Sequence, residues 1–297
     1  MTNEISIILP AKNEAEGLSR LLPELCGLFP AAEIIVVNDG STDNTMEVCA
    51  ANNVKVIRHV YSMGNGAAIK TGARNAHGNI LVFMDADGQH NPADITALVD
   101  KINAGFDMAV GARHLDTHAS ITRRVGNIIY NKLASWMTGY PVEDLTSGFR
   151  AARARHFRKF LYLLPNQFSY PTTSTMAFFR SGLPVGYIPI KANKRTGGRK
   201  SHIRLLHDGF RFLIIILKIG ALFSPMRFFL PVSALLLGSG LVYYGYTYLT
   251  WGRLTNMSAI LFLSALFTFL FGIISEQISA LHYKDIQDTR RNTVRND

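Results

Sequence analysis

Two carboxylates separated by one small residue, Asp85 and Asp87, are the side chains of this sequence best suited to chemistry. They follow residues 80–84, an unbroken apolar run typical of a fully buried strand in a parallel sheet. Open α/β sheets bind ligands at the carboxyl ends of their strands, so this spacing directs both acids into that crevice. Carboxylates there favour Mg²⁺ or Mn²⁺ bound to phosphates, because Mg²⁺ takes one or two carboxylates and completes its shell with substrate oxygens and water.

The elements that must position these acids are predicted from apolar runs that alternate with helix-like segments. Strands are expected at residues 5–9, 33–38, 54–58, 80–84 and 107–112. Strands that alternate with helices at this spacing indicate an α/β fold with a doubly wound, mostly parallel sheet. After residue 121 the pattern is less regular, and two further strands are expected at residues 175–179 and 185–190.

The last third of the chain has the composition of a membrane protein. Residues 203–219 alternate apolar clusters with basic side chains, as an interfacial amphipathic helix does. Residues 228–251 and 257–275 carry no charge, and each run is long enough to cross a bilayer as a helix. Lys and Arg are enriched on the outer flanks of both runs, so both termini are expected to be cytoplasmic. The polar start of the chain, residues 1–4, does not resemble a secretory signal.

A formal net charge of +10 requires an anionic partner or surface. Nucleic acid would explain the charge but would leave the acidic pair and the two apolar runs unexplained, so phosphorylated substrates and anionic lipid fit better. Cys26 and Cys49 lie in segments with a helical pattern, and we expect structural thiols there instead of a disulfide or a metal site.

Five motifs follow one another in a fixed order: PAKNE at residues 10–14, VNDGSTD at 37–43, GNG at 64–66, DADGQH at 85–90 and TSGFR at 146–150. In this order they resemble family 2 glycosyltransferases. The chain is most similar to the polyprenyl-phosphate sugar transferases, a group that includes dolichol-phosphate mannose synthases and bacterial undecaprenyl-phosphate glucosyltransferases. The resemblance covers about residues 4–202, and the two apolar runs are similar to those of membrane-anchored bacterial members.

The resemblance implies a GT-A fold, a UDP- or GDP-sugar donor, a polyprenyl phosphate acceptor and inversion at the anomeric carbon. By position, it assigns the nucleotide-sugar pocket to Pro10, Asn13, Glu14, Asp39, Lys70 and Asp85, and the Mg²⁺ or Mn²⁺ ion to Asp85, Asp87 and Gln89. It assigns the acceptor phosphate to Arg113, Arg124, Ser147 and Arg150. Arg195, on a basic loop, would close over the site, so the expected catalytic set is Asp87, Arg113, Arg124, Ser147 and Arg195.

The expected layout is a cytoplasmic GT-A domain at 1–202, an interfacial amphipathic region at 203–227, a transmembrane hairpin at 228–281 and a cytoplasmic tail at 282–297. The expected location is a bacterial inner membrane. Some bacterial relatives are tetramers, so the resemblance also allows a homo-oligomer.

Several alternatives remain open at this point. An Asx-turn is the alternative for Asp39, and the glycines at residues 64 and 66 would equally suit a simple turn. His90 is better explained as a helix-entry residue than as a ligand. Alternative functions are a non-catalytic membrane-tethered protein that binds a nucleotide sugar and a glycosyltransferase with another membrane acceptor. A processive polysaccharide synthase would need a Gln-x-x-Arg-Trp segment, which this sequence lacks.

Overall fold

The computed structural model describes residues 4–113, 121–167, 170–191 and 223–294. The chain divides into two compact units, Met1–Ser201 and His202–Asp297. The described residues of the first unit form seven strands: β1 Ile5–Ala11, β2 Glu33–Asn38, β3 Lys55–Arg58, β4 Ile80–Phe83, β5 Met108–Arg113, β6 Arg150–Arg153 and β7 Val185–Ile190. They form one sheet in the order β3-β2-β1-β4-β6-β5-β7. Six of the expected strands are therefore confirmed, with ends shifted by a residue or two.

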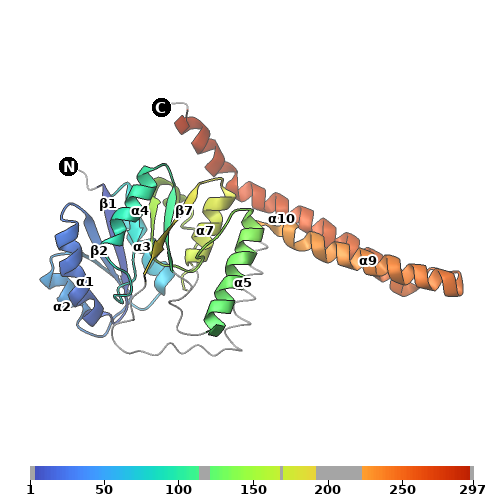
Figure 1. The fold of residues 1–297 in the computed structure, drawn as a ribbon, viewed down its shortest axis with the longest axis horizontal. Coiled ribbons are helices and arrows are strands. Elements are labelled where there is room, and N and C mark those ends of the chain that lie inside the picture. Colours follow the sequence, from blue (N-terminus) through green and yellow to red (C-terminus); the bar gives the residue numbers. More distant parts are fainter. Residues whose placement is uncertain (1–3, 114–120, 168–169, 192–222, 295–297) are drawn as a thin grey trace. The chain divides into compact units, whose positions relative to one another are not determined.

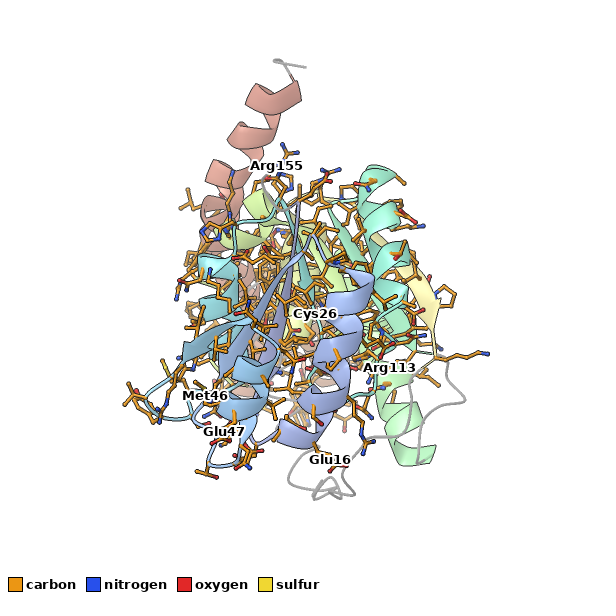
Figure 2. The ribbon with its side chains drawn as sticks, turned by 90° about the vertical axis from the view of Figure 1, so that its left-hand side faces the viewer. Glu16, Cys26, Met46, Glu47, Arg113 and Arg155 are labelled. Atoms are coloured by element: carbon orange, nitrogen blue, oxygen red, sulfur yellow. The ribbon has the colours of Figure 1, made fainter. Side chains whose placement is uncertain are left out.

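The parallel direction of most strands brings their carboxyl ends to one edge of the sheet. β1 pairs in parallel with β2 and β4, β2 with β3, and β5 with β7. β6 alone runs antiparallel, to β4 and to β5, so its first residue lies at the edge where the parallel strands end. Figure 2 shows the two edges: Arg113, the last residue of β5, lies at one end of the domain, and Arg155, just after β6, lies at the other.

Helices cover both faces of this sheet (Figure 1). They are α1 Ala15–Leu28, α2 Thr45–Ala51, α3 Asn65–Asn75, α4 Asp94–Asn103, α5 Ile121–Thr138, α6 Ala154–Lys159 and α7 Tyr170–Arg180. The leucines of α1 and the apolar side of α4 share a core with Ile7 and Leu9 of β1. α3 packs on the other face, where Gly72 lies against Ile8 and Val37. Cys26 in α1 and Cys49 in α2 are free thiols.

Two parts of the sequence-based assignment are wrong. Residues 175–179 belong to the helix α7 and not to a strand; nearly the whole of α7 is buried, and a short buried apolar run has no periodicity that separates helix from strand. The strand β6 was missed because its sequence, Arg-Ala-Ala-Arg, lacks β-branched and aromatic residues. It pairs on both sides, with β4 and with β5, so tertiary pairing overrides its weak propensity.

The second unit contains α9 Pro225–Trp251 and α10 Asn256–Val294. The segments Pro225–Trp251 and Asn256–Leu281 have mean hydropathies of 1.5 and 2.4 and are long and apolar enough to cross a membrane. Small residues allow the two helices to pack closely: Gly240 lies against Phe262, and the Ser233 hydroxyl donates to the Ala265 carbonyl at 2.8 Å. Residues 203–222, most of the predicted interfacial region at 203–227, lie outside the described residues.

Candidate active site

The edge where the parallel strands end gathers most of the residues that the sequence singled out: Pro10 at the end of β1, Asn13 and Glu14 before α1, Asp39 after β2, Asp85 and Asp87 after β4, Arg113 at the end of β5, and Ser147 before β6. Figure 2 shows Arg113 and Glu16 at this edge. Residues of the first motif, at 10–14, and of the last, at 146–150, therefore lie at the same edge, as expected for an open α/β sheet.

The turn after β4 presents the two acids differently. The Asp85 side chain is 37% exposed, whereas Asp87 is buried. Gly17 of α1 packs directly beneath this turn, because a β-carbon there would overlap the carbonyl oxygen of Ala86. The backbone N–H of Gln89 donates to Asp87 Oδ1 at 3.2 Å, which keeps the turn closed. Asp85 therefore faces the crevice, and its turn is held in place by α1.

The loop 144–150 lies against this turn because of strand register. Phe83 of β4 pairs with Arg150 of β6 in antiparallel fashion, so Asp85 lies opposite Gly148. The two are in contact: a β-carbon on Gly148 would lie 2.9 Å from Asp85 Oδ2. A larger residue at this position would require the Asp85 side chain to shift. The expected metal ligand and the expected acceptor loop are thus direct neighbours.

Asp144 organises this loop. Its Oδ1 accepts hydrogen bonds from the backbone N–H groups of Thr146 and Ser147, both at 3.1 Å. It also forms an ion pair with Arg113, whose Nη2 donates to Thr146 Oγ1 at 2.7 Å. Burial alone would raise the pKa of Asp144, but the Arg113 guanidinium outweighs it and holds this pKa below its ordinary value. Asp144 is ionised at neutral pH and fixes Arg113 beside Ser147.

Ser147 is fully buried, and its hydroxyl has no hydrogen-bond partner among the described residues. A buried hydroxyl of this kind is costly unless something binds it. Its neighbours on either side, Thr146 and Gly148, line a pocket of about 130 Å³ together with Asp85. The rest of the pocket wall comes from Asn65, Gln167, Tyr170, Pro171 and Thr172.

Arg150 does not reach the crevice. Its side chain is fully buried, and its guanidinium donates to the carbonyl oxygens of Ser147 and Pro171 and to the hydroxyls of Ser174 and Thr175. The expectation that Arg150 binds the acceptor phosphate is therefore wrong: its fork is occupied by protein oxygens, and it joins α7 to the 144–150 loop. Arg113, in contrast, is the last residue of β5 and lies at the edge where the parallel strands end.

Asp39, which follows β2, is surrounded by the loop that connects β3 to α3. Its carboxylate accepts hydrogen bonds from the N–H groups of Met63 and Gly64, at 2.7 and 2.9 Å, and from the Ser62 hydroxyl at 2.8 Å. His59 Nδ1 lies 2.7 Å from the same carboxylate. Burial raises the pKa of Asp39, but these donors outweigh it, so the pKa lies below its ordinary value. Asp39 anchors the loop between β3 and α3.

Two other residues assigned to the nucleotide-sugar pocket also bind protein groups. Asn13 has a positive φ of 56°, and its side-chain oxygen accepts from the Thr42 N–H at 2.7 Å, which joins the loops after β1 and β2. Lys70 donates to the Leu164 carbonyl at 3.1 Å and to the Asn166 side chain. Lys70 therefore braces α3 against residues 164–166, which lead to Gln167 in the pocket wall.

Comparison with known proteins decides the family. Residues 6–161, more than half of the chain, match Glycosyl transferase family 2. The chain belongs to this family. Residues 224–281 match the GtrB C-terminal hairpin, a segment that contains α9 and the first part of α10.

Individual relatives agree with this assignment. Glycosyltransferase AglJ of Haloferax volcanii is 24% identical over 296 residues, which cover 95% of this chain and 96% of that protein. Polyprenol monophosphomannose synthase of Mycolicibacterium smegmatis is 28% identical over 213 residues, 66% of this chain and 80% of that one. Glucosyl-3-phosphoglycerate synthase from Mycobacterium tuberculosis, solved with Mn²⁺ and uridine-diphosphate-glucose, has a similar fold, with a TM-score of 0.59 at 21% identity over 72% of this chain and 78% of that chain. This chain is a glycosyltransferase with the GT-A fold.

The turn after β4 is the part of this site that could hold a divalent metal ion. Among the described residues, no group of three or more His, Cys, Asp or Glu side chains lies close enough to form a metal site by itself. Asp85 and Asp87 nevertheless fit Mg²⁺ or Mn²⁺ in a family 2 site, because such ions need only one or two carboxylates when phosphate oxygens complete the shell. Gln89 follows in the same turn and adds an amide oxygen of the same hard type.

Some residues assigned by the resemblance lie where their side chains are not described. Arg124 falls in the first turn of α5, of which the structure describes the backbone only, and Arg195 lies outside the described residues. Conversely, the sequence reading missed Asp144, Gln167 and Tyr170. An Asp two residues before the Thr-Ser-Gly of the 146–150 motif is a signal for an Asx-turn, which would have suggested Asp144. The other two are brought to the site only by the fold.

Proposed function

We propose that this family 2 glycosyltransferase moves one hexose, such as glucose or mannose, from a UDP- or GDP-sugar to a polyprenyl phosphate, with inversion and with Mg²⁺ or Mn²⁺. The observation that carries the proposal is the contact between Asp85 and Gly148. It joins a turn suited to a metal-bound diphosphate to a loop suited to a second phosphate. A glycosyltransferase whose acceptor is itself a phosphate needs these two phosphate sites next to each other.

On the donor side, Asp85 and Asp87 would hold the ion, with Gln89 beside them. When bound, the ion supplies positive charge to the departing diphosphate. The pocket of about 130 Å³ between Asp85 and Thr146 offers a place for one sugar ring, and its amide and hydroxyl groups suit sugar hydroxyls. Asp39 would contribute by holding the 59–64 loop in place next to the nucleotide.

On the acceptor side, Arg113 and Ser147 would bind the lipid phosphate. They lie side by side because Val110 of β5 pairs with Arg150 of β6, so the residues that continue these strands face each other. A phosphate monoester has a second pKa of about 6 and is largely dianionic at neutral pH, so it attacks without help from a base. The chain then has to orient this nucleophile and keep its charge balanced. Arg124 and Arg195 would add positive charge to the same phosphate.

Similar proteins support this acceptor and this donor. One relative is named a polyprenol monophosphomannose synthase, and a protein of similar fold was solved with Mn²⁺ and uridine-diphosphate-glucose. The apolar hairpin of α9 and α10 would hold the enzyme in a membrane, where a polyprenyl phosphate resides. We place the GT-A domain and both termini on the cytoplasmic side, in keeping with the basic flanks of the hairpin.

The test is nucleotide release by the detergent-purified full chain with undecaprenyl phosphate, Mg²⁺ or Mn²⁺, and a panel of UDP- and GDP-sugars. We expect release with one donor that depends on both lipid and metal and yields a new glycolipid. Release that is independent of lipid would contradict the proposed acceptor. Tight nucleotide binding without release from any donor would instead favour a non-catalytic nucleotide-sugar-binding protein.

A further inference from the structure

His90 connects the metal-binding turn with the acceptor loop. Its ring is 6% exposed and stacks on Phe149, with ring centroids 4.9 Å apart and planes inclined by 13°. On its other side, Nε2 lies 3.9 Å from Asp85 Oδ2. One ring therefore contacts a residue of the 144–150 loop and faces the more exposed of the two acids.

The stacking partner is itself held in the core. Phe149 is fully buried in the core, and its carbonyl oxygen accepts a hydrogen bond from the Gly111 N–H of β5 at 3.0 Å. A ring stacked on Phe149 consequently has little freedom to turn. The orientation of the imidazole is therefore set by the acceptor loop and the core.

The polar edge of the ring points toward Asp85. Nδ1 is buried and has no hydrogen-bond partner among the described residues, which leaves the Asp85 carboxylate as the acceptor facing the ring. With its proton on Nε2, the imidazole presents an N–H dipole to Asp85 Oδ2. The separation of 3.9 Å is about 1 Å longer than a hydrogen bond, so a small rotation of the carboxylate closes it.

We propose that His90 is a positioning residue that orients the Asp85 carboxylate toward the divalent cation, with Phe149 and the neighbouring Gly148 holding this arrangement in register with the acceptor loop. The inference rests on the proposed function, because it presupposes that Asp85 binds a metal ion. Carboxylates that ligate metals are generally oriented by outer hydrogen bonds, and removing such a partner weakens metal binding by about 10- to 100-fold. His90 would not touch the ion or the sugar.

Three variants of the detergent-purified full chain separate the polar contact from the packing. His90→Phe keeps an aromatic ring to stack on Phe149 but removes the N–H, His90→Ala removes both, and Asn91→Ala changes the next residue, which is exposed. The dissociation constant of Mn²⁺ is measured with saturating UDP and, separately, GDP. Thermal unfolding is recorded for each variant, so that loss of fold is distinguished from loss of binding.

We expect both His90 variants to weaken Mn²⁺ binding by about 10-fold, with Asn91→Ala unchanged and His90→Phe as stable as the wild type. Wild-type affinity in a folded His90→Phe would overturn the inference, even if His90→Ala fails to fold. Absence of Mn²⁺ binding in the wild type would also overturn it. Normal Mn²⁺ binding without transfer from any donor would refute the proposed function alone, because the role of His90 is decided by binding.

Discussion

The guanidinium of Arg113 and the carboxylate of Asp144 form a bidentate ion pair, with Nε 2.8 Å from Oδ2 and Nη2 3.0 Å from Oδ1. Burial alone would lower the pKa of Arg113, but the adjacent carboxylate reverses the effect and raises it. The paired geometry fixes the plane of the fork, which a lysine in the same place would not have. The charge at the acceptor side of the site is thus both permanent and oriented.

Replacing Asp144 with Asn tests this pairing. Asn keeps the size but loses the charge and one acceptor, so Arg113 and the N–H groups of Thr146 and Ser147 lose their common partner. We expect the KM for polyprenyl phosphate to rise about 10-fold, with the KM for the donor and the Mn²⁺ affinity unchanged, as for the loss of one charge-assisted contact. The mirror variant Arg113→Lys should shift the same parameter. A change confined to the KM for the donor would show that Asp144 acts at the donor site instead of the acceptor site.

Asp87→Asn tests the metal site. Removal of one of two carboxylates should weaken Mn²⁺ binding and reduce transfer by about 100-fold or more, whereas folding and membrane insertion should persist because the change is nearly isosteric. The measurements are sugar transfer across Mn²⁺ concentrations and thermal unfolding in detergent. Asp94→Asn, in the first turn of α4, is the matched control. Unchanged turnover in Asp87→Asn would remove the metal role from this turn.

Asp39→Asn separates an anchoring role from direct contact with the nucleotide. Met63 donates to Oδ1 and Gly64 to Oδ2, so the amide nitrogen of Asn leaves one of these two N–H groups unpaired, at a cost of about 1–3 kcal/mol. We expect faster hydrogen exchange in residues 59–64 together with weaker nucleotide binding. Weaker binding with exchange in that loop unchanged would show instead that Asp39 contacts the nucleotide itself.

Glu33 predicts how stability depends on pH. It lies at the start of β2 and accepts hydrogen bonds from the Ser6 hydroxyl at 2.6 Å and from the His77 N–H at 2.7 Å, with Lys55 beside it. Burial raises its pKa, but these donors lower it to about 2 from 4.5. Because the pKa is lower in the folded protein, Glu33 contributes full stability above pH 4.5, and this contribution is lost as the pH falls from 4.5 toward 2.

The measurement for Glu33 is the unfolding temperature of Glu33→Gln and wild type between pH 7 and pH 3. We expect the variant to be less stable by about 2 kcal/mol at pH 7, with the difference shrinking below pH 4.5. Glu16→Gln is the control, because its ion pair with Arg20 is exposed and contributes little. A difference that stays constant across this range would show that Glu33 acts by packing and not by charge.

Much of this molecule follows from local sequence pattern. The alternation of apolar runs and helices determined the parallel part of the sheet, since a buried strand and an amphipathic helix have different and visible periods. The acids after residues 80–84 were placed at the correct edge for the same reason, because parallel strands end on one side. The two long uncharged runs, likewise, needed only their length to predict helices that can cross a bilayer.

The tertiary structure decided how the motifs meet. The antiparallel strand β6 has a weak local signal, yet its register with β4 and β5 is what sets Gly148 against Asp85 and Ser147 beside Arg113. The same applies to Arg150, which a motif cannot distinguish from a phosphate ligand until its neighbours in α7 are known. Pairing between distant segments depends on shape and on hydrogen bonds that neither segment encodes alone, so a side chain's role at this site became readable only when both partners were in place.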